Sequence, residues 1–443
     1  MTTKVCKFGG TSLADAAQVQ KVQSIVEAEP ARRYVVASAP GKRTAEDQKV
    51  TDLLYLCHEH AKQGLGFDEV FGLIATRFRE MARALAVGGE IDAALAEVRE
   101  GIAAHARTDA GPDFAASRGE YLNSRLLAER LGVPFVDAAE IIFFNGRGRL
   151  DEAKTYAAIG DRLGGLERAV VPGFYGSTPG GDIKTFSRGG SDVTGAIVAR
   201  GVHAAVYENW TDVSGLLMTD PRIVSNPRKI ETITYRELRE LSYSGATVLH
   251  EEAVFPVREA GIPVNIRNSN APDEPGTMIV RGDVTDLPRS GSITGIAGRK
   301  DFTVINIDKA LMNAELGFGR RVLHVLEDSG ISFEHMPSGI DTLGVVVSDA
   351  ALAGKLEEVL EKLRVEVEPD HIEIDRDLAL IATVGRGMAH TPGMAAKLFG
   401  SLGAAGINIR MIDQGSSELN IIVGVDAHDY EDAVRAIYAA FVG

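Results

Sequence analysis

The segment Lys7-Phe8-Gly9-Gly10-Thr11-Ser12 brings a lysine, two glycines and two hydroxyl residues to the end of an apolar strand. Glycines allow close backbone approach, and successive N–H groups at a helix N-terminus favour an anion. A lysine just inside the strand can reach the same anion as a point charge. A ligand-free strand-to-helix turn explains the glycines equally well, because lone glycine-rich motifs are common. The segment matches neither a Walker A sequence nor G-x-G-x-x-G.

A second segment, Arg188-Gly189-Gly190-Ser191-Asp192, follows a turn-rich loop and opens another expected helix. An arginine fork beside a helix start suits recognition of a carboxylate or phosphate. Helix capping by Ser191 or Asp192 is the alternative, and it does not explain the preceding Arg-Gly-Gly. The two segments together predict two anion-binding turns.

Three further groups of polar residues have weaker signals. Thr211-Asp212 and Thr219-Asp220 flank a glycine turn and could cup a ribose, although Asx-turn chemistry explains them locally. Ser117–Glu120 is expected to begin a helix, where the helix dipole favours a carboxylate. A lone glutamate at such a position is usually a cap.

The remaining residue types predict no side-chain metal site and no nucleophilic triad. The two cysteines and ten histidines show no metal-ligand spacing. A formal charge of −15 repels nucleic acid and anionic lipid. We see no secretory leader and no window that approaches 18 apolar residues. The sequence therefore predicts a cytoplasmic protein with no nucleic-acid and no membrane partner.

The elements that must position these residues alternate short apolar runs with amphipathic stretches, as in a layered α/β domain. A length of 443 residues suggests about three folding units. The expected strands and helices nearest the two turns are strands at Val5–Phe8, Tyr34–Ala39 and Val133–Asp137 and helices at Leu13–Glu27, Ser117–Leu131 and Asp192–Arg200.

The pattern changes around Asp286–Gly291 and then repeats itself. Gly317 aligns with Gly393, and Gly330 with Gly406, at one constant offset. Each copy has the order of a ferredoxin-like βαββα unit. The second copy ends one strand short, and Ile293–Ala297 is a candidate to complete it. The expected domains are residues 1–290, 291–375 and 376–443, with 292–298 completing the last.

Two anion-binding turns in an acidic α/β domain favour phosphoryl transfer, in which catalysis is mostly positioning and charge neutralisation. Several motifs then occur in the order typical of one family. The chain resembles a monofunctional aspartate kinase over essentially its whole length, on the motifs KFGGTSLAD (Lys7–Asp15), SAPGK (Ser38–Lys42), VTDLL (Val50–Leu54), SRGEYLNSRLLA (Ser117–Ala128), FSRGGSDVTGA (Phe186–Ala196), WTDVSGLLMTDPR (Trp210–Arg222) and GATVLHE (Gly245–Glu251). The repeat resembles the paired ACT domains of that family.

The resemblance implies a three-layer αβα amino-acid-kinase fold and two ferredoxin-like βαββαβ ACT domains. It implies phosphorylation of the β-carboxylate of L-aspartate to 4-phospho-L-aspartate by ATP with Mg²⁺ held mainly by phosphates. Lys7 would neutralise the transferring phosphoryl group, Asp192 would orient the reacting groups, and Glu120 would face the substrate ammonium. The other implied aspartate-site residues are Ser38, Thr51, Phe174, Arg188 and Ser191.

For the nucleotide, the resemblance implies backbone N–H donors at Gly9 and Gly10. The other implied nucleotide residues are Thr11, Thr211, Asp212, Leu217, Asp220, Arg222, Thr247 and Val248. Many relatives have a lysine within Gly245–Val248 and a tyrosine at Leu217. Loss of one cation near phosphates is expected to weaken ATP binding by about 1–3 kcal/mol.

The ACT pair resembles modules that bind lysine or threonine and join subunits into a homodimer or homotetramer. The implied effector residues are Met312, Asn313, Gly317, Phe318, Gly319, Ser338, Asp341 and Thr342. A pure dimerisation scaffold is the alternative. Two other functions remain open, namely a kinase of another small carboxylate or carbamate and a non-catalytic amino-acid sensor.

Overall fold

The computed structural model describes residues 2–187, 189–246, 251–282 and 292–443. The described residues form two compact units. The first comprises Met1–Leu216, Glu231–Tyr235 and Leu249–Val284, and the second Leu217–Ile230, Arg236–Val248 and Thr285–Gly443, as far as these ranges are described. The expected boundary at Asp286–Gly291 lies outside the described residues.

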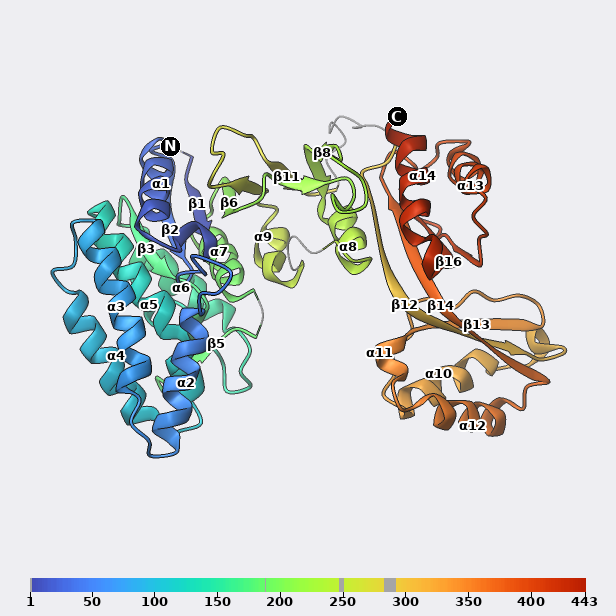
Figure 1. Cartoon of the computed structure of the whole chain (residues 1–443), viewed down its shortest axis with the longest axis horizontal. Helices are drawn as coiled ribbons and strands as arrows, with labels where there is room; N and C mark the ends of the chain where they lie inside the picture. The colour runs from blue at the N-terminus through green and yellow to red at the C-terminus, as the bar shows by residue number, and fades with distance from the viewer. Residues whose placement is uncertain (1, 188, 247–250, 283–291) are drawn as a thin grey trace. The chain divides into compact units, whose positions relative to one another are not determined.

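The elements of the chain up to residue 211 keep the labels that Figure 1 shows for most of them. They are β1 (Lys4–Phe8), η1 (Thr11–Leu13), α1 (Ala16–Glu27), β2 (Arg32–Ala37), α2 (Val50–Lys62), α3 (Asp68–Ala84), α4 (Ile91–His105), α5 (Gly111–Leu131), η2 (Ala138–Glu140), α6 (Glu152–Leu163), β3 (Ala169–Pro172), β4 (Tyr175–Ser177), β5 (Ile183–Thr185), α7 (Gly190–Gly201) and β6 (Val206–Thr211). Residues 216–280 supply β7 (Leu216–Leu217), β8 (Lys229–Ile230), β9 (Thr232–Thr234), α8 (Tyr235–Tyr243), η3 (Glu251–Val254), α9 (Phe255–Ala260), β10 (Val264–Asn268) and β11 (Thr277–Val280).

The sheet of the first unit has the strand order β3-β2-β1-β6-β10-β11-β9. Its pairs are parallel except for β10 with β11, which are antiparallel. Helix α7 packs on β1, β2 and β6, and α6 and α9 pack on α7. Helices α1 and α5 pack on β2. The expected αβα sandwich is confirmed.

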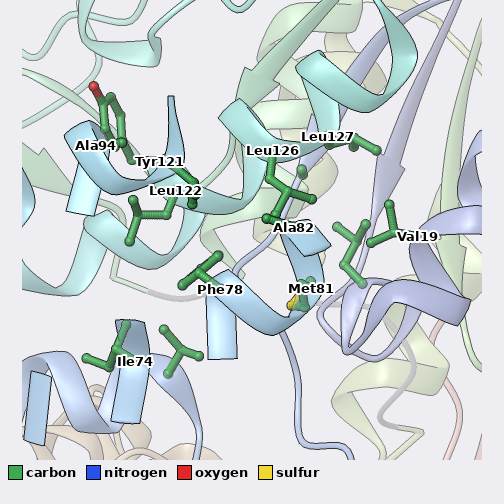
Figure 2. Packing of buried hydrophobic residues seen from close by; sticks show 14 of the residues in the cluster. Val19, Ile74, Phe78, Met81, Ala82, Ala94, Tyr121, Leu122, Leu126 and Leu127 are labelled. Atoms are coloured by element: carbon green, nitrogen blue, oxygen red, sulfur yellow. The ribbon is translucent and has the colours of Figure 1, made fainter. Parts of the chain in front are cut away.

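One hydrophobic core cluster of this unit lies where α1, α3, α4 and α5 meet (Figure 2). Phe78, Met81 and Ala82 of α3 point toward Leu122 and Leu126 of α5 in this cluster. Buried apolar side chains at helical spacing on α3 explain why this stretch forms an amphipathic helix. The core holds α5 in place, and α5 carries Glu120.

Several expected elements differ from the observed ones. Helix α5 begins at Gly111, because Pro112 lies in its first turn, where a missing N–H is harmless. The expected strand Val133–Asp137 is reduced to one bridge, from Phe135 to Val170. A short 3-10 turn precedes α1, and the Asp15 side chain caps α1 by accepting from the Gln18 N–H at 2.9 Å.

The second unit contains β12 (Gly295–Asp308), η4 (Met312–Ala314), α10 (Phe318–Asp328), β13 (Thr342–Ser348), α11 (Asp349–Leu352), α12 (Leu356–Val367), β14 (His371–Val384), α13 (Met394–Ala404), β15 (Met411–Asp413), β16 (Asn420–Asp426), η5 (Ala427–Asp429) and α14 (Tyr430–Val442). Its sheet has the order β13-β12-β14-β16-β15. The two 14-residue strands β12 and β14 run antiparallel, side by side (Figure 1).

Each long strand serves both repeats. The half of β12 from Phe302 to Asp308 pairs with β13, whereas Gly295–Arg299 pairs with Leu380–Val384 of β14. The latter half of β14 also pairs with β16. An irregular register between Arg299 and Phe302 separates the two halves of β12. The start of β12 therefore supplies a strand to the sheet of the second repeat.

Candidate active site

The lysine of the first glycine-rich segment and the aspartate of the second lie in contact. Lys7 is at the end of β1 and 8% exposed, and its Nζ is 2.6 Å from Oδ1 of Asp192. Asp192 lies in the first turn of α7, where the helix dipole stabilises a carboxylate. The two predicted turns therefore meet at one place. Arg188 lies outside the described residues.

A third side chain, Asn209 of β6, joins this ion pair and has no counterpart among the sequence predictions. Its Nδ2 donates to Oδ1 of Asp192 at 3.0 Å, and its Oδ1 accepts from Nζ of Lys7 at 3.4 Å. Asn209 is in register with Lys7 on the adjacent parallel strand, so both side chains leave the same face of the sheet. Only the strand order reveals this pairing.

The glycine turn is packed tightly against the loop after β2. The carbonyl of Gly10 accepts from the N–H of Gly41 at 2.8 Å, and a Cβ on Gly41 would lie 2.6 Å from the Gly10 carbonyl carbon. The N–H of Gly9 donates to the carbonyl of Trp210 at 3.0 Å. The expectation that Gly9 offers this N–H to a nucleotide is therefore wrong, because the sheet already uses it. Thr11 is exposed at the start of η1.

Glu120 lies in the middle of α5, so the expectation that it begins a helix is wrong. It is 6% exposed, and Oε2 has no hydrogen-bond partner among the described residues. Burial raises the pKa of Glu120 to about 8, against a smaller opposing effect of a backbone hydrogen bond from Ala39. A buried carboxyl with an unused oxygen is suited to receive a cationic group.

Phe174 and Ser191 are held together by two glycines. A Cβ on Gly190 would lie 2.3 Å from Cδ2 of Phe174, and a Cβ on Gly173 would lie 2.5 Å from Oγ of Ser191. Phe174 has a φ of 81°, a conformation that is strained for a bulky residue, and its N–H donates to Oγ1 of Thr194 at 3.0 Å. The start of α7 can therefore approach the β3–β4 connection only because both glycines lack side chains.

Ser38 and Thr51 lie on neighbouring parts of the same unit. The N–H of Ser38 donates to the carbonyl of Phe8 at 3.2 Å, and Nδ2 of Asn123 donates to the carbonyl of Ser38 at 2.7 Å. Ser38 is thus tied both to the residue after Lys7 and to α5. Thr51 is half-buried in the first turn of α2, which packs on α5.

The predicted nucleotide residues are divided between the two units. Thr211 and Asp212 end β6 in the first unit, where Oγ1 of Thr211 donates to the Asp212 carboxylate at 3.2 Å. Asp220 and Arg222 belong to the second unit and bind each other, with Nη2 of Arg222 2.6 Å from Oδ2 of Asp220. Hydrogen bonds from Arg222 lower the pKa of Asp220.

Leu217 is half-buried in β7 and also belongs to the second unit. Thr247 and Val248 lie outside the described residues. Among the described residues, a nucleotide-binding role for Leu217, Asp220 and Arg222 therefore rests on the resemblance alone.

The predicted effector residues occupy a loop and a turn of the first repeat that contact each other. Oδ1 of Asp341 accepts from the Leu311 N–H at 2.8 Å, and the Asn313 N–H donates to the Ile340 carbonyl at 3.2 Å. Gly317 caps α10 with a φ of 80°, and Gly319 is in the first turn. Ser338 and Thr342 are exposed on the turn.

Two of the predicted effector residues are core residues of the first repeat. Met312 is 7% and Phe318 4% exposed, and both belong to the cluster that packs β12, β13, α10 and α12 together. Their backbone is at the loop, whereas their side chains face the core.

Two cavities lie apart from these residues. One, of about 320 Å³, is lined by helices α4 and α5, and the other, of about 300 Å³, by α8 and the sheet of the second unit. Their charged side chains already have partners, as in Arg125 with Glu90 at 2.7 Å, His335 with Asp413 at 2.6 Å and Glu129 with the Gly88 N–H at 2.9 Å. We assign a ligand to neither.

Open α/β sheets bind ligands at the carboxyl ends of their strands, and the lysine–aspartate pair lies at this edge of the sheet. The amino acid kinase family model matches residues 2–268, and an ACT domain model matches residues 381–441. The matched residues include Lys7, Asp192 and Asn209.

Similar proteins indicate which amino acid kinases this chain is related to. Aspartokinase 3 of Bacillus subtilis is 39% identical, over 99% of this chain and 98% of its own length. The crystal structure of Clostridium acetobutylicum aspartate kinase has a TM-score of 0.91 and 53% identity, with all of both chains covered. The chain belongs to the aspartokinase family and is an enzyme of this type.

Escherichia coli aspartokinase III is more distant, at 27% identity. Its complex with aspartate and ADP has a TM-score of 0.73, with 99% of both chains covered, and its complex with lysine and aspartate 0.75, with all of both chains covered. The chain spans about half the length of bifunctional aspartokinase/homoserine dehydrogenase 1 of Zea mays, which is 29% identical over 99% of this chain. No helix among the described residues is both long and apolar enough to cross a membrane.

Proposed function

We propose that this aspartate kinase transfers the γ-phosphoryl group of ATP to the β-carboxylate of L-aspartate, with Lys7 and Asp192 at the reacting centre. The contact between Lys7 and Asp192 at 2.6 Å carries the proposal. An ammonium group beside a transferring phosphoryl group neutralises the charge that develops on its oxygens. The substrate carboxylate is already ionised at neutral pH, so Asp192 orients Lys7 and need not act as a base.

Recognition of aspartate is proposed to use both charged groups on its α-carbon. The unused Oε2 of Glu120 would receive the α-ammonium group, and Arg188 would bind the α-carboxylate. The remaining substrate-site residues that we propose are Ser38, Thr51, Phe174 and Ser191. This pairing of one buried carboxyl with one arginine favours an α-amino acid over a simple carboxylate.

For the nucleotide, we propose Gly10, Thr11, Thr211 and Asp212 from the first unit. On the resemblance alone, we also propose nucleotide-binding roles for Leu217, Asp220, Arg222, Thr247 and Val248. Of the described acidic groups, Asp192 is the one that contacts Lys7, and its Oδ1 is shared by Lys7 and Asn209. This donor set fits a Mg²⁺ ion held mainly by phosphate oxygens, where it would offset phosphate charge.

Regulation is proposed to act through the repeats, with lysine or threonine bound at the loop and turn around Asn313, Gly317 and Asp341. We propose residues 1–290 as the catalytic domain and 291–375 and 376–443 as two ACT domains, with 292–298 completing the second. Subunits would join into a dimer or tetramer through these domains. The exposed Asp341 carboxylate is the group suited to an effector ammonium.

The test is a reaction of the purified protein with ATP, Mg²⁺ and hydroxylamine, which traps an acyl phosphate as its hydroxamate. We expect product with L-aspartate and little with succinate, which lacks the ammonium group. Equal rates with both acids would favour a general carboxylate kinase. No product with either acid, with or without lysine and threonine, would leave the sensor interpretation.

A further inference from the structure

The side-chain amide of Asn209 bridges the Lys7–Asp192 ion pair. Asn209 is 4% exposed and lies on β6, beside β1 in the sheet. Its two polar atoms divide their contacts by charge, since Nδ2 faces the carboxylate of Asp192 and Oδ1 faces the ammonium of Lys7. The same side chain therefore contacts both proposed reacting-centre residues.

The chemistry of the partners determines the orientation of this amide. An ionised carboxylate only accepts hydrogen bonds, and an ammonium group only donates them. If the amide were rotated by half a turn, its Nδ2 donor would face the Lys7 ammonium and its Oδ1 acceptor would face the Asp192 carboxylate, and neither contact could be a hydrogen bond. An asparagine fits both partners at once, whereas an aspartate lacks the donor and a leucine lacks both groups.

Few described side chains around Asn209 carry charge. On this face of β1, β6 and β10, the titratable residues that the structure describes are Lys7 and Tyr207, and Asp192 joins them from α7. The Tyr207 hydroxyl donates to the main-chain carbonyl of Asp192 at 3.1 Å. On the other flank, β10 presents Ile266 in register with Asn209. Within the described residues, Asn209 is thus the neutral polar side chain that links the pair.

We propose that Asn209 is a positioning residue for phosphoryl transfer, which keeps Asp192 oriented when the Lys7 ammonium turns toward the phosphoryl group. The inference rests on the proposed roles of Lys7 and Asp192. A phosphoryl group that attracts Lys7 weakens its contact with Asp192, and the Nδ2 donor then remains on the carboxylate. Without that donor, the lysine and the aspartate lose a fixed relative position.

The first test replaces Asn209 by leucine, which has the same branching at Cγ and no polar side-chain atoms. We expect kcat with L-aspartate to fall by about 10- to 100-fold, because small misplacement of reacting groups has effects of this size. The KM for aspartate should change by less than about threefold, since Asn209 contacts the reacting centre and not the Glu120 side of the pocket. Asn265→Leu on β10 is the matched control, because Asn265 is in register with Glu208 and faces the opposite side of the sheet. It should keep the wild-type kcat.

The second test, Asn209→Asp, is close to isosteric and reports on protonation. A carboxyl at this position, near Asp192, would share a proton with it as a coupled pair. When the two carboxyl groups of the variant share one proton, that proton is a hydrogen-bond donor between them, as the Asn209 amide is in the wild type. When both carboxyl groups are ionised, the variant has one more negative charge beside the phosphoryl group. We therefore expect activity at low pH that declines at a lower pH than in the wild type.

The outcomes separate this inference from the proposed function. A wild type that phosphorylates aspartate, an Asn209→Leu variant with unchanged kcat and an Asn209→Asp variant with the wild-type pH profile would overturn the role of Asn209 alone. An inactive wild type would overturn the proposed function instead. If Asn209→Leu does not fold, as judged by its melting curve, the pH profile of Asn209→Asp decides.

Discussion

The reacting centre and the tip of the first repeat, which we define as residues 309–317 and 338–342, are built in opposite ways. Lys7, Asp192 and Asn209 are fixed by side-chain contacts on two adjacent strands and a helix start. Most of the tip is exposed, and the hydrogen bonds that join its two segments use backbone groups, such as the Lys309 N–H that donates to the Asp341 carbonyl at 2.8 Å. Substitutions in the centre should therefore change the chemical step, and charge changes at the tip should change recognition alone.

The tip of the second repeat, residues 385–393 and 415–419, provides an internal control. Its Gly385 N–H donates to the Leu419 carbonyl at 2.9 Å, and Oε2 of Glu418 accepts from the His390 N–H at 2.7 Å. Asp341 accepts from Leu311 in the same manner in the first repeat. Each tip thus has a backbone N–H that donates to a carboxylate of the facing segment, and the other side chains differ.

Exposed apolar residues distinguish the first tip. Leu311 is 73%, Leu316 95% and Ile340 70% exposed. The second tip has mainly polar or small residues, as in His390-Thr391-Pro392-Gly393 and Gly415-Ser416-Ser417. Since exposed apolar groups gather where proteins bind partners, this difference favours the first tip as the surface for an effector or a second subunit.

The largest expected effect is at Lys7. Lys7→Met should lower kcat by about 1,000-fold, because charge neutralisation at a phosphoryl group is worth factors of this size. The measurement is the hydroxamate rate per folded molecule, with folding checked by circular dichroism. Effector binding by calorimetry should be unchanged. If Lys7→Met kept the wild-type hydroxamate rate but lost effector binding, the assignment of chemistry to the reacting centre and of recognition to the first tip would be wrong.

The second effect concerns Glu120 and pH. Its pKa of about 8 means that the free enzyme holds a proton at neutral pH, which an incoming ammonium group displaces. Aspartate affinity should therefore rise with pH up to about 8 and then level off. Glu120→Gln should bind aspartate about 10- to 100-fold more weakly at pH 8, with little pH dependence. Calorimetry in two buffers of different ionisation enthalpy should show proton release in the wild type alone.

The same pKa shift has a consequence for stability. The folded-state pKa of Glu120, about 8, lies above the usual glutamate pKa of 4.5, so the folded protein binds more protons than the unfolded chain between these two pH values. Its contribution to stability is present below about pH 4.5 and is lost as pH rises toward 8. Relative to the wild type, Glu120→Gln should gain thermal stability over this interval. A constant difference between the two melting temperatures would contradict the shift.

The smallest expected effect compares the two tips. Asp341→Asn keeps an oxygen for the Leu311 N–H and removes the charge, so lysine or threonine affinity should fall about 10-fold, with kcat within twofold of the wild type. Glu418→Gln is the matched variant in the second repeat and should leave effector affinity unchanged. Equal losses in both variants would mean that the repeats share the role.

The motifs predicted the family correctly, because each is local. The glycines at 9, 10, 189 and 190 lie within three residues of Lys7 or Asp192 in the chain, and the order of motifs indicated the family. The fold class followed from the alternation of apolar and amphipathic segments. Helix starts were less predictable, as with α5, because its first turns carry few apolar residues at helical spacing.

The sequence by itself determined which side chains bring charge to the site and which segments repeat, since residue type and spacing are properties of the chain. Tertiary structure decided which of them meet. Asn209 joins Lys7 because β6 lies beside β1 although about 200 residues separate them in the chain. The pKa of Glu120 is raised because the surrounding core excludes water, and the Gly9 N–H donates to the Trp210 carbonyl because β6 lies beside β1. Contacts between distant segments depend on strand order and burial, which no local pattern encodes.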